Sequence, residues 1–296
     1  MTETIGVIFA TMGKDYTALA ERAAQTVKEN CPGLEVDLFT DQSADMPVFD
    51  RIHQLEDPHR RSKIDAMIAS RFDKTLYLDA DLFVIADIRD VFEVLDRFDM
   101  AMVQDQYLNG GHAQTIWRKP FPNAFPQFNG GVVAYRRSTE VLELLENWRT
   151  AVREDDLKRD QPVLRELVWD SDLRVATLPP EYNLMRFEVL SLWDEQKSAA
   201  PRIIHSPKLH LHFTSKRNKE RFDTLEDLLG PKLRPSCQSC LLRIKILRVW
   251  LDESLRIRAK ENARYSNGCV KSVMRAAGGS DFELSSRSRL GDTHQD

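Results

Sequence analysis

Short apolar runs alternate with segments of helical period along most of this 296-residue chain. The runs are IGVIFA, LEVDLFT, TLYLDA, MAMV, GVVAY, LRVATL and RIIHS. Between them, apolar spacing predicts helices at Tyr16–Asn30, at residues 59–70, at Thr139–Arg153 and at Gln161–Val168. This alternation predicts an α/β domain whose central sheet is mostly parallel and is flanked by helices. At 42% hydrophobic residues, the chain has enough apolar side chains for a full core.

One of these runs ends in a pair of aspartates, Asp79 and Asp81, separated only by Ala80. Side chains two residues apart on an extended segment point to the same side, so both carboxylates can face one ligand. In a parallel sheet, ligands bind beyond the carboxyl ends of the strands, where this pair is expected. Two carboxylates suit a hard divalent cation such as Mn²⁺ or Mg²⁺, whereas the alternative is a pair of turn or helix caps.

The chain ends in two segments of different character. Residues 231–296 carry 13 basic against 7 acidic side chains, although the whole chain has a net charge of −4. We therefore expect a main α/β domain at 1–230, a basic amphipathic helical extension at 231–265 and a disordered polar tail at 266–296. Two interpretations of residues 240–260 stay open: a helix packed on its own domain, or an interfacial helix in peripheral contact with a membrane. The acidic main domain argues against a nucleic acid partner.

The first residues, MTETIGVIFA, have no basic leader and resemble a first strand, and no apolar stretch is long enough to span a bilayer. The four cysteines are too few for a disulfide framework, which fits a reducing compartment. We expect a cytoplasmic protein, either free or peripheral on the inner face of a membrane. The C-x-x-C of Cys237 and Cys240 lacks a second ligand pair, so it favours a plain thiol pair over zinc.

Several stretches match the motifs of one group of enzymes, in the same order along the chain. They are LYLDAD around the aspartates, FNGGVVAYRRS at 128–138, RDQPVLRELV at 159–168, LPPEYNLM at 178–185 and IIHSPKLHLHF at 203–213. The series resembles the glycosyltransferases of the GT-A fold, most closely the glycogenin-like and bacterial galactosyltransferase-like group of family 8. The resemblance implies the GT-A (nucleotide-diphospho-sugar transferase) fold.

The resemblance also implies a metal site and a reacting centre. Asp79, Asp81 and His205 would hold Mn²⁺ or Mg²⁺. The pair Asp160 and Gln161 would lie beside the reacting sugar. The usual last motif has His, two residues, Gly, two residues and Lys, whereas here a lysine follows His205 after only two residues. His210 and His212 therefore stay open as alternative metal ligands.

The remaining implied residues would bind the donor. They are Thr11, Tyr16, Lys63, Asp79, Ala80, Asp81, Asp105, Asn129, Gly130 and Lys208. Asn129 would contact the donor sugar, Asp105 would lie near its hydroxyls, and Thr11 and Tyr16 would lie where the nucleoside docks. Lys63 would reach the donor, and Lys208 would contact the diphosphate. For several of them the alternative is an ordinary surface or capping residue.

The resemblance implies transfer of a sugar, with retention, from a nucleotide-diphospho-sugar, usually a UDP-sugar, to an acceptor hydroxyl. The acceptor could be a glycan, a lipid-linked sugar or a protein, and the segment Tyr107–Gln127 has the composition of a substrate-facing loop. Retention by double displacement would use Asp160 or Gln161, whereas a front-face route needs no protein nucleophile.

Three other functions are alternatives to sugar transfer. A sugar-nucleotide nucleotidyltransferase would need a glycine-rich basic loop after the first strand, where ATMGKDY has one glycine and one lysine. A haloacid dehalogenase-type phosphatase would carry its aspartate pair on the first strand, whereas here the pair follows about the third. A non-catalytic nucleotide-sugar binding protein would be expected to lack part of the metal set.

Overall fold

The structure is a computed structural model that describes residues 3–43, 45–108, 110–111, 113–155, 159–192 and 199–233. The chain divides into two compact units, residues 1–238 and 239–296, and every described residue lies in the first. The predicted amphipathic extension, the polar tail and the pair Cys237 and Cys240 therefore lie outside the described residues. Among the described helices, none is both long and apolar enough to cross a membrane.

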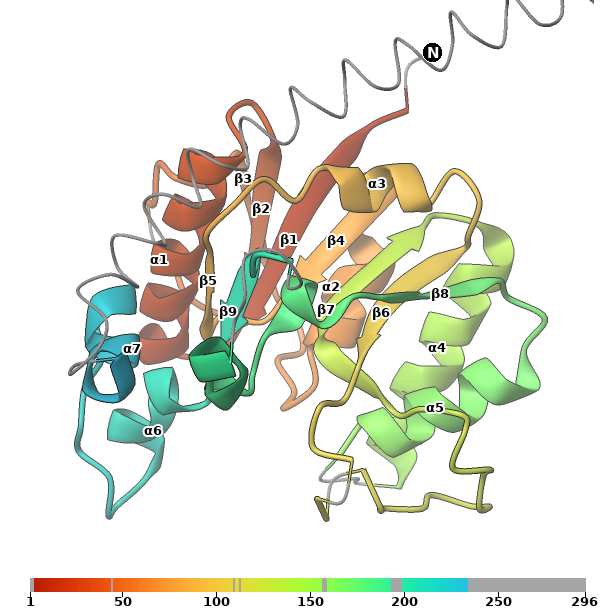
Figure 1. The fold of residues 1–296 in the computed structure, drawn as a ribbon. Helices are drawn as coiled ribbons and strands as arrows, with labels where there is room; N and C mark the ends of the chain where they lie inside the picture. Colours follow the sequence, from red (N-terminus) through yellow and green to blue (C-terminus); the bar gives the residue numbers. More distant parts are fainter. Residues whose placement is uncertain are drawn as a thin grey trace, which may run out of the picture. The chain divides into compact units, whose positions relative to one another are not determined.

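A seven-stranded sheet forms the centre of the first unit (Figure 1). Its strands in spatial order are β3 (Arg51–Gln54), β2 (Glu35–Thr40), β1 (Ile5–Thr11), β4 (Lys74–Leu78), β7 (Phe128–Arg136), β6 (Met100–Gln104) and β8 (Val175–Leu178). Strands β1 to β4 run parallel, β6 and β8 run parallel to each other, and β7 is antiparallel to both of its neighbours. The predicted mostly parallel α/β sheet is confirmed.

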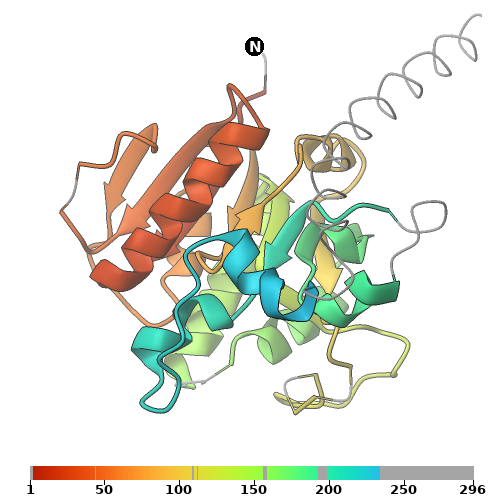
Figure 2. The same cartoon turned by 60° about the vertical axis from the view of Figure 1, so that its left-hand side comes forward.

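Helices cover both faces of this sheet (Figure 2). The helices are α1 (Lys14–Asn30), α2 (Lys63–Ala69), α3 (Asp90–Val94), α4 (Thr139–Glu154) and α5 (Gln161–Asp170). Residues of α1 and α3 belong to one buried apolar cluster, and residues of α2, α4 and α5 belong to another.

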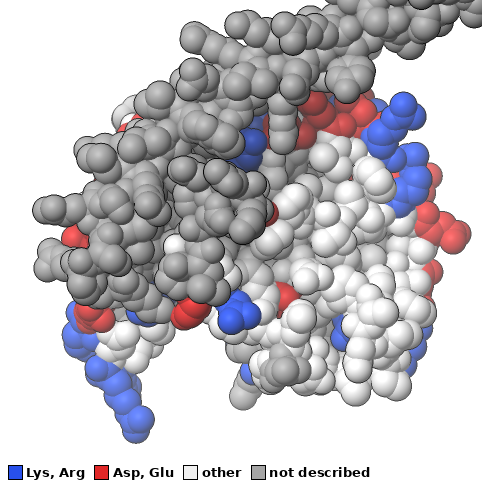
Figure 3. All heavy atoms as spheres, in the orientation of Figure 1, with Lys and Arg blue, Asp and Glu red and all other residues white. Residues whose placement is uncertain are grey.

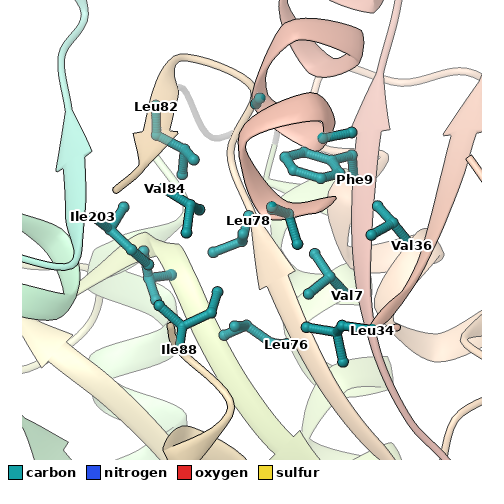
Figure 4. Close-up of a cluster of buried hydrophobic side chains, with 14 of the residues drawn as sticks. Val7, Phe9, Leu34, Val36, Leu76, Leu78, Leu82, Val84, Ile88 and Ile203 are labelled. Atoms are coloured by element: carbon teal, nitrogen blue, oxygen red, sulfur yellow. The ribbon is translucent and has the colours of Figure 1, made fainter. Parts of the chain in front are cut away.

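Alternate residues of each central strand supply these two clusters. Val7 and Phe9 of β1 lie in the cluster with α1, and Ile8 lies between them in sequence but in the other cluster. Leu76 and Leu78 of β4 likewise face one way and Tyr77 the other. Figure 4 shows the first of these clusters. A strand such as β4 is buried along its whole length, and its residues 76–78 form an uninterrupted run of Leu, Tyr and Leu, as expected for a strand that is covered on both faces.

A small second sheet pairs two strands that are far apart in the sequence. It pairs β5 (Leu82–Val84) with β9 (Ile203–His205) in antiparallel fashion, with Leu82 opposite His205. Around it lie the 3₁₀ segments η1 (Pro180–Asn183) and η2 (Phe187–Leu192) and the helices α6 (Lys208–Thr214) and α7 (Leu225–Leu233). This sheet brings a segment more than a hundred residues downstream directly against the residue that follows Asp81.

Two expectations about the elements were wrong. The second helix begins at Lys63 and not at His59, because the Ser62 hydroxyl accepts from the His59 amide at 2.6 Å and holds residues 59–62 in a turn. The acidic pair follows the fourth strand and not the third, because β3 is a short, largely exposed edge strand with little apolar character.

Candidate functional site

Three chain segments converge where β4 ends. Asp79 and Asp81 lie between β4 and β5. Strand β7 is antiparallel, so its first residues, from Phe128 on, reach the same edge as the end of β4, and the Asp79 amide donates to the Gly131 carbonyl at 2.8 Å. Strand β9 ends there with His205. The site therefore forms at the carboxyl end of the parallel strands, as expected for an open α/β sheet.

Asp79, Asp81 and His205 form one compact group. Each offers a ligand atom within 4.8 Å of the others, and Asp81 and His205 are buried while Asp79 is half-buried. Nε2 of His205 lies 3.1 Å from Oδ1 of Asp81. Two carboxylates and one imidazole form a donor set that suits a divalent cation. The three residues that sequence reasoning assigned to the metal are thus brought together.

Each member of the group is also held by a residue behind it. The Tyr77 hydroxyl donates to Asp79 Oδ1 at 2.5 Å, and His210 Nδ1 lies 2.9 Å from Asp81 Oδ2. The Asn183 side-chain oxygen lies 2.8 Å from His205 Nδ1. Such supporting contacts orient metal ligands and tune their basicity.

The charges of this group shift one another's pKa. Burial raises the pKa of Asp81, but the nearby rings of His205 and His210 outweigh burial and hold it well below its usual range. Burial lowers the pKa of His205, and the Asp81 carboxylate outweighs it and raises that pKa above its usual value. Each residue thus stabilises the charged form of the other, and a cation bound at this group would replace the proton that His205 shares with Asp81.

Gly131 lies directly against the side chains of His205 and Asp79, and sequence reasoning missed it. A Cβ atom added there would lie 2.6 Å from His205 Cε1, 2.7 Å from Asp79 Oδ2 and 3.0 Å from Asn129 Oδ1. Only glycine leaves room for these three side chains to approach. The FNGG stretch carried this signal, but it did not show which glycine faces the acids.

A second cluster surrounds Asp160, at the start of α5. The Lys63 ammonium lies 2.7 Å from Asp160 Oδ2 and donates to the Gly130 carbonyl at 3.0 Å. Arg61 lies 3.7 Å from the other carboxylate oxygen. Burial raises the pKa of Asp160, but Lys63 and Arg61 outweigh it and keep the pKa below its usual value. Asp160 is therefore an ionised carboxylate held by two cations.

Two further predicted residues lie near this cluster. Gln161 accepts a hydrogen bond from the buried side chain of Gln127 at 3.4 Å. Asp105 is buried after β6, and one of its carboxylate oxygens accepts from the Tyr107 amide at 2.9 Å. The structure thus brings Lys63, Gly130, Asp160 and Gln161 together.

The other predicted donor residues have different surroundings. The Thr11 hydroxyl lies in a buried network, 3.0 Å from that of Thr17. The Tyr16 ring lies 5.7 Å from that of His210, and burial together with Asp81 and Asp79 raises its pKa. The exposed Lys208 carries its ammonium 5.8 Å from the Phe222 ring, not beside the acidic pair.

The surface next to the site is poor in charge. Figure 3 shows a largely uncharged area over the region where Figure 1 places the segment between β6 and β7. Tyr107, Leu108 and Ile116 of this segment are exposed apolar residues. A cavity of about 370 Å³ opens there; its lining includes Leu108, Gln106, Leu184, Arg186, Val189 and Leu190. Gln106 connects the cavity to the site, because its side chain donates to the Asn183 carbonyl at 2.5 Å.

Solved structures share this fold. The glycosyltransferase GlyE of Streptococcus pneumoniae TIGR4 aligns with a TM-score of 0.55 at 18% identity, covering 86% of this chain and 64% of that one. The galactosyltransferase LgtC, solved with donor and acceptor sugar analogs, aligns with a TM-score of 0.50 at 14% identity, covering 68% and 87%. This chain thus spans slightly less than two thirds of the GlyE chain. Comparison with curated protein sequences gives no match.

Fold and site together define a GT-A type α/β protein. The model of the nucleotide-diphospho-sugar transferase family matches residues 18–221. The chain belongs to this family.

Proposed function

We propose that this protein is a metal-dependent glycosyltransferase that moves a sugar from a nucleotide-diphospho-sugar to an acceptor hydroxyl. One observation carries the proposal: in a member of this family, Asp79, Asp81 and His205 offer ligand atoms within 4.8 Å of one another at the carboxyl edge of the sheet. A binding protein would be expected to lack part of the metal set, and a nucleotidyltransferase would need a glycine-rich basic loop after β1, where ATMGKDY has one glycine and one lysine.

Asp79, Asp81 and His205 would hold the cation. The imidazole favours Mn²⁺ over Mg²⁺, since Mg²⁺ prefers oxygen ligands alone. When bound, the cation supplies positive charge that offsets the charge developing on the leaving diphosphate. Gly131 keeps the space between the ligands open, and Tyr77 and His210 fix the two carboxylates before any ligand arrives.

Lys63 would be the protein's own cation for the donor phosphates. Its ammonium is held by Asp160 and the Gly130 carbonyl, so it needs little reorganisation when the donor binds. Asn129, Asp105 and Ala80 would contact the sugar side, and Thr11 and Tyr16 the nucleoside side. Lys208 would have to turn away from Phe222 to reach the phosphates, which makes it the weakest member of the donor set.

We propose retention of configuration, by the front-face route. Asp160 is paired with Lys63 at 2.7 Å and with Arg61, so covalent attack would require it to leave two cations. Instead of attacking the sugar, the Asp160 carboxylate would hold Lys63 and stabilise the positive charge that develops on the sugar. Gln161, at the first position of α5, would contact the same sugar. Proton NMR of the first released sugar, before its anomers equilibrate, should show the configuration of the donor, and inverted sugar would contradict retention.

The acceptor would enter over the uncharged surface of the segment Tyr107–Gln127 and the 370 Å³ cavity beside it. Apolar side chains with a few polar groups are typical of sites for small molecules. A glycan, a lipid-linked sugar and a protein side chain all remain acceptors to test.

Peripheral membrane contact through residues 240–260 stays a prediction, because that segment lies outside the described residues. Co-sedimentation with anionic liposomes tests it, comparing the full chain with a chain that ends at residue 236. Loss of sedimentation in the shorter chain would support the contact, and equal sedimentation would rule it out.

A donor screen without acceptor tests the proposed function. The full chain is incubated with each nucleotide-sugar in Mn²⁺ or in EDTA, and release of the nucleoside diphosphate is measured. We expect slow hydrolysis of at least one UDP-sugar in Mn²⁺ and none in EDTA. Equal release in both, or release of a nucleoside monophosphate, would contradict the proposal.

A further inference from the structure

A chain of hydrogen bonds joins the backbone of β7 to the metal-facing ring of His205. Oδ1 of Asn129 accepts from the Gly131 amide at 2.9 Å and from Nδ2 of Asn183 at 2.9 Å. Oδ1 of Asn183 lies 2.8 Å from Nδ1 of His205. From this chain we propose that Asn183 is a positioning residue that fixes the tautomer of His205 and couples the metal group to the Asn129 amide. The inference rests on the proposed metal-dependent function.

The direction of every bond follows from one backbone donor. The Gly131 N–H can only donate, so the Asn129 atom that faces it must be the oxygen. That oxygen also faces the Asn183 side chain, which must therefore present its NH₂ group. The remaining Asn183 atom is then the oxygen, an acceptor, so Nδ1 of His205 must carry a proton. The orientation of both amides and the tautomer of the ring are thus set without reference to any ligand.

The proton on Nδ1 determines which nitrogen of His205 is left to face the metal group, namely Nε2. With one ring proton fixed on Nδ1, the other ring nitrogen, Nε2, faces Oδ1 of Asp81 at 3.1 Å. Without a cation, Nε2 can carry a second proton and donate it to Asp81. A divalent cation beside Asp79 and Asp81 would take the place of that proton and bind the Nε2 lone pair, and a metal-bound histidine typically donates its second N–H to an acceptor such as the Asn183 oxygen.

Burial and backbone hydrogen bonds fix the position of Asn183. Its side chain is 0% exposed, and its carbonyl accepts from Gln106. The next residue, Leu184, donates to the Ile203 carbonyl and accepts from the His205 amide at 3.0 Å, so backbone hydrogen bonds tie the end of η1 to β9. No water can replace the Asn183 oxygen without opening this packing.

The same chain reaches toward the sugar. Because both acceptor positions of Asn129 Oδ1 are used, its Nδ2 points away from the chain, and it lies 3.3 Å from the Met185 sulfur. A thioether is a weak acceptor, so this N–H group is free to exchange it for a sugar hydroxyl. Asn183 thereby fixes the orientation of the Asn129 side-chain amide as well as the tautomer of the His205 ring.

Two variants separate the two ends of the chain. Asn183→Asp keeps an oxygen for His205 Nδ1 but loses the donor to Asn129, whereas the nearly isosteric Asn183→Leu loses both. The control Asn30→Leu removes a side-chain amide that bonds the carbonyls of Thr26 and Val84. For each full-length protein, Mn²⁺ affinity is measured without nucleotide by electron paramagnetic resonance of free Mn²⁺. Donor KM and thermal unfolding of the metal-free protein are measured alongside.

We expect Asn183→Leu to bind Mn²⁺ about 10- to 100-fold more weakly, the usual effect of losing a contact behind a metal ligand. Asn183→Asp should bind Mn²⁺ about as well as the wild type but with a raised donor KM. A purely structural role would instead lower the melting temperature and change Mn²⁺ affinity alike in both variants. Asn30→Leu should leave Mn²⁺ affinity unchanged, whatever its melting temperature.

Wild-type affinity in a folded Asn183→Leu would overturn the inference, as would equal loss of affinity in both Asn183 variants. Failure of the proposed function looks different: the wild type and Asn183→Asp would bind Mn²⁺, but no nucleotide-sugar would be turned over. A wild type that binds no Mn²⁺ would overturn the metal site and the role of Asn183 together.

Discussion

Gly131 lies directly against His205: a Cβ atom on the glycine would come within 2.6 Å of the ring carbon Cε1. Real Cβ contacts are essentially never that short, so any side chain at position 131 must displace the ring or the neighbouring Asp79 carboxylate. The requirement for glycine comes from space and not from backbone conformation, because Gly131 is not among the residues with positive φ.

Gly131→Ala should therefore disable the site. The added methyl group forces His205 or Asp79 aside, and we expect metal-dependent donor hydrolysis to fall by about 100-fold, since small misplacements of reacting groups carry losses of this size. The matched control is Gly111→Ala, where a Cβ would meet nothing within 4 Å. Equal activity of the two variants would show that the approach of Gly131 to the metal group is unimportant.

Lys63→Met should impair catalysis more than it impairs folding. The variant keeps most of the apolar stem but removes the charge beside Asp160 and Gly130. Losing a group that stabilises developing charge typically costs about 100- to 1,000-fold in kcat. Lys119→Met, which breaks the pairing of an exposed lysine with Asp170, is the control. Steady-state kinetics of donor hydrolysis check this, and a control-like Lys63→Met would remove Lys63 from the donor site.

The paired state of Asp160 predicts how stability depends on pH. Because its pKa is lowered in the folded protein, the carboxylate stabilises the fold above the ordinary aspartate pKa of about 3.9. This stabilisation is lost as pH falls through the lower, folded-state pKa. Asp160→Asn should therefore reduce the free energy of unfolding at pH 7, by up to about 3–5 kcal/mol, and by less at pH 3.

Urea unfolding of the metal-free proteins at both pH values measures this difference. Asp172→Asn, at an exposed carboxylate, is the control and should show little change at either pH. A destabilisation by Asp160→Asn that is the same at pH 3 and pH 7 would contradict the assigned ion pair.

Much of the fold could be predicted because the central strands are buried on both faces. The strands β1 and β4 carry runs without charged residues, VIFA and TLYL, bounded by segments of helical period, so their place in a parallel sheet could be predicted. Strand β3 was missed because RIHQ is an exposed edge segment. Strand β5 was missed because its three residues gain their conformation from pairing with β9, a contact far along the chain.

The grouping of Asp79, Asp81 and His205 could be predicted from ordered motifs, but the residues that support them could not. Tyr77 looks like any apolar strand residue, and Asn183 meets Asn129 across 54 positions of sequence. The placement of Lys208 shows a further limit. It begins α6, and residues two apart on a helix are separated by about 200°, so Lys208 turns to Phe222 while His210 faces Asp81.

Asp79 and Asp81 should hold a cation that is essential for nucleotide-sugar turnover. The most direct measurement is release of UDP from the preferred UDP-sugar in Mn²⁺ by the wild type, Asp79→Asn, Asp81→Asn and the control Asp172→Asn. Circular dichroism and thermal unfolding confirm that each variant is folded. We expect turnover to be abolished in both site variants and retained in the control. Undiminished turnover in folded Asp79→Asn and Asp81→Asn would contradict this role of the cation.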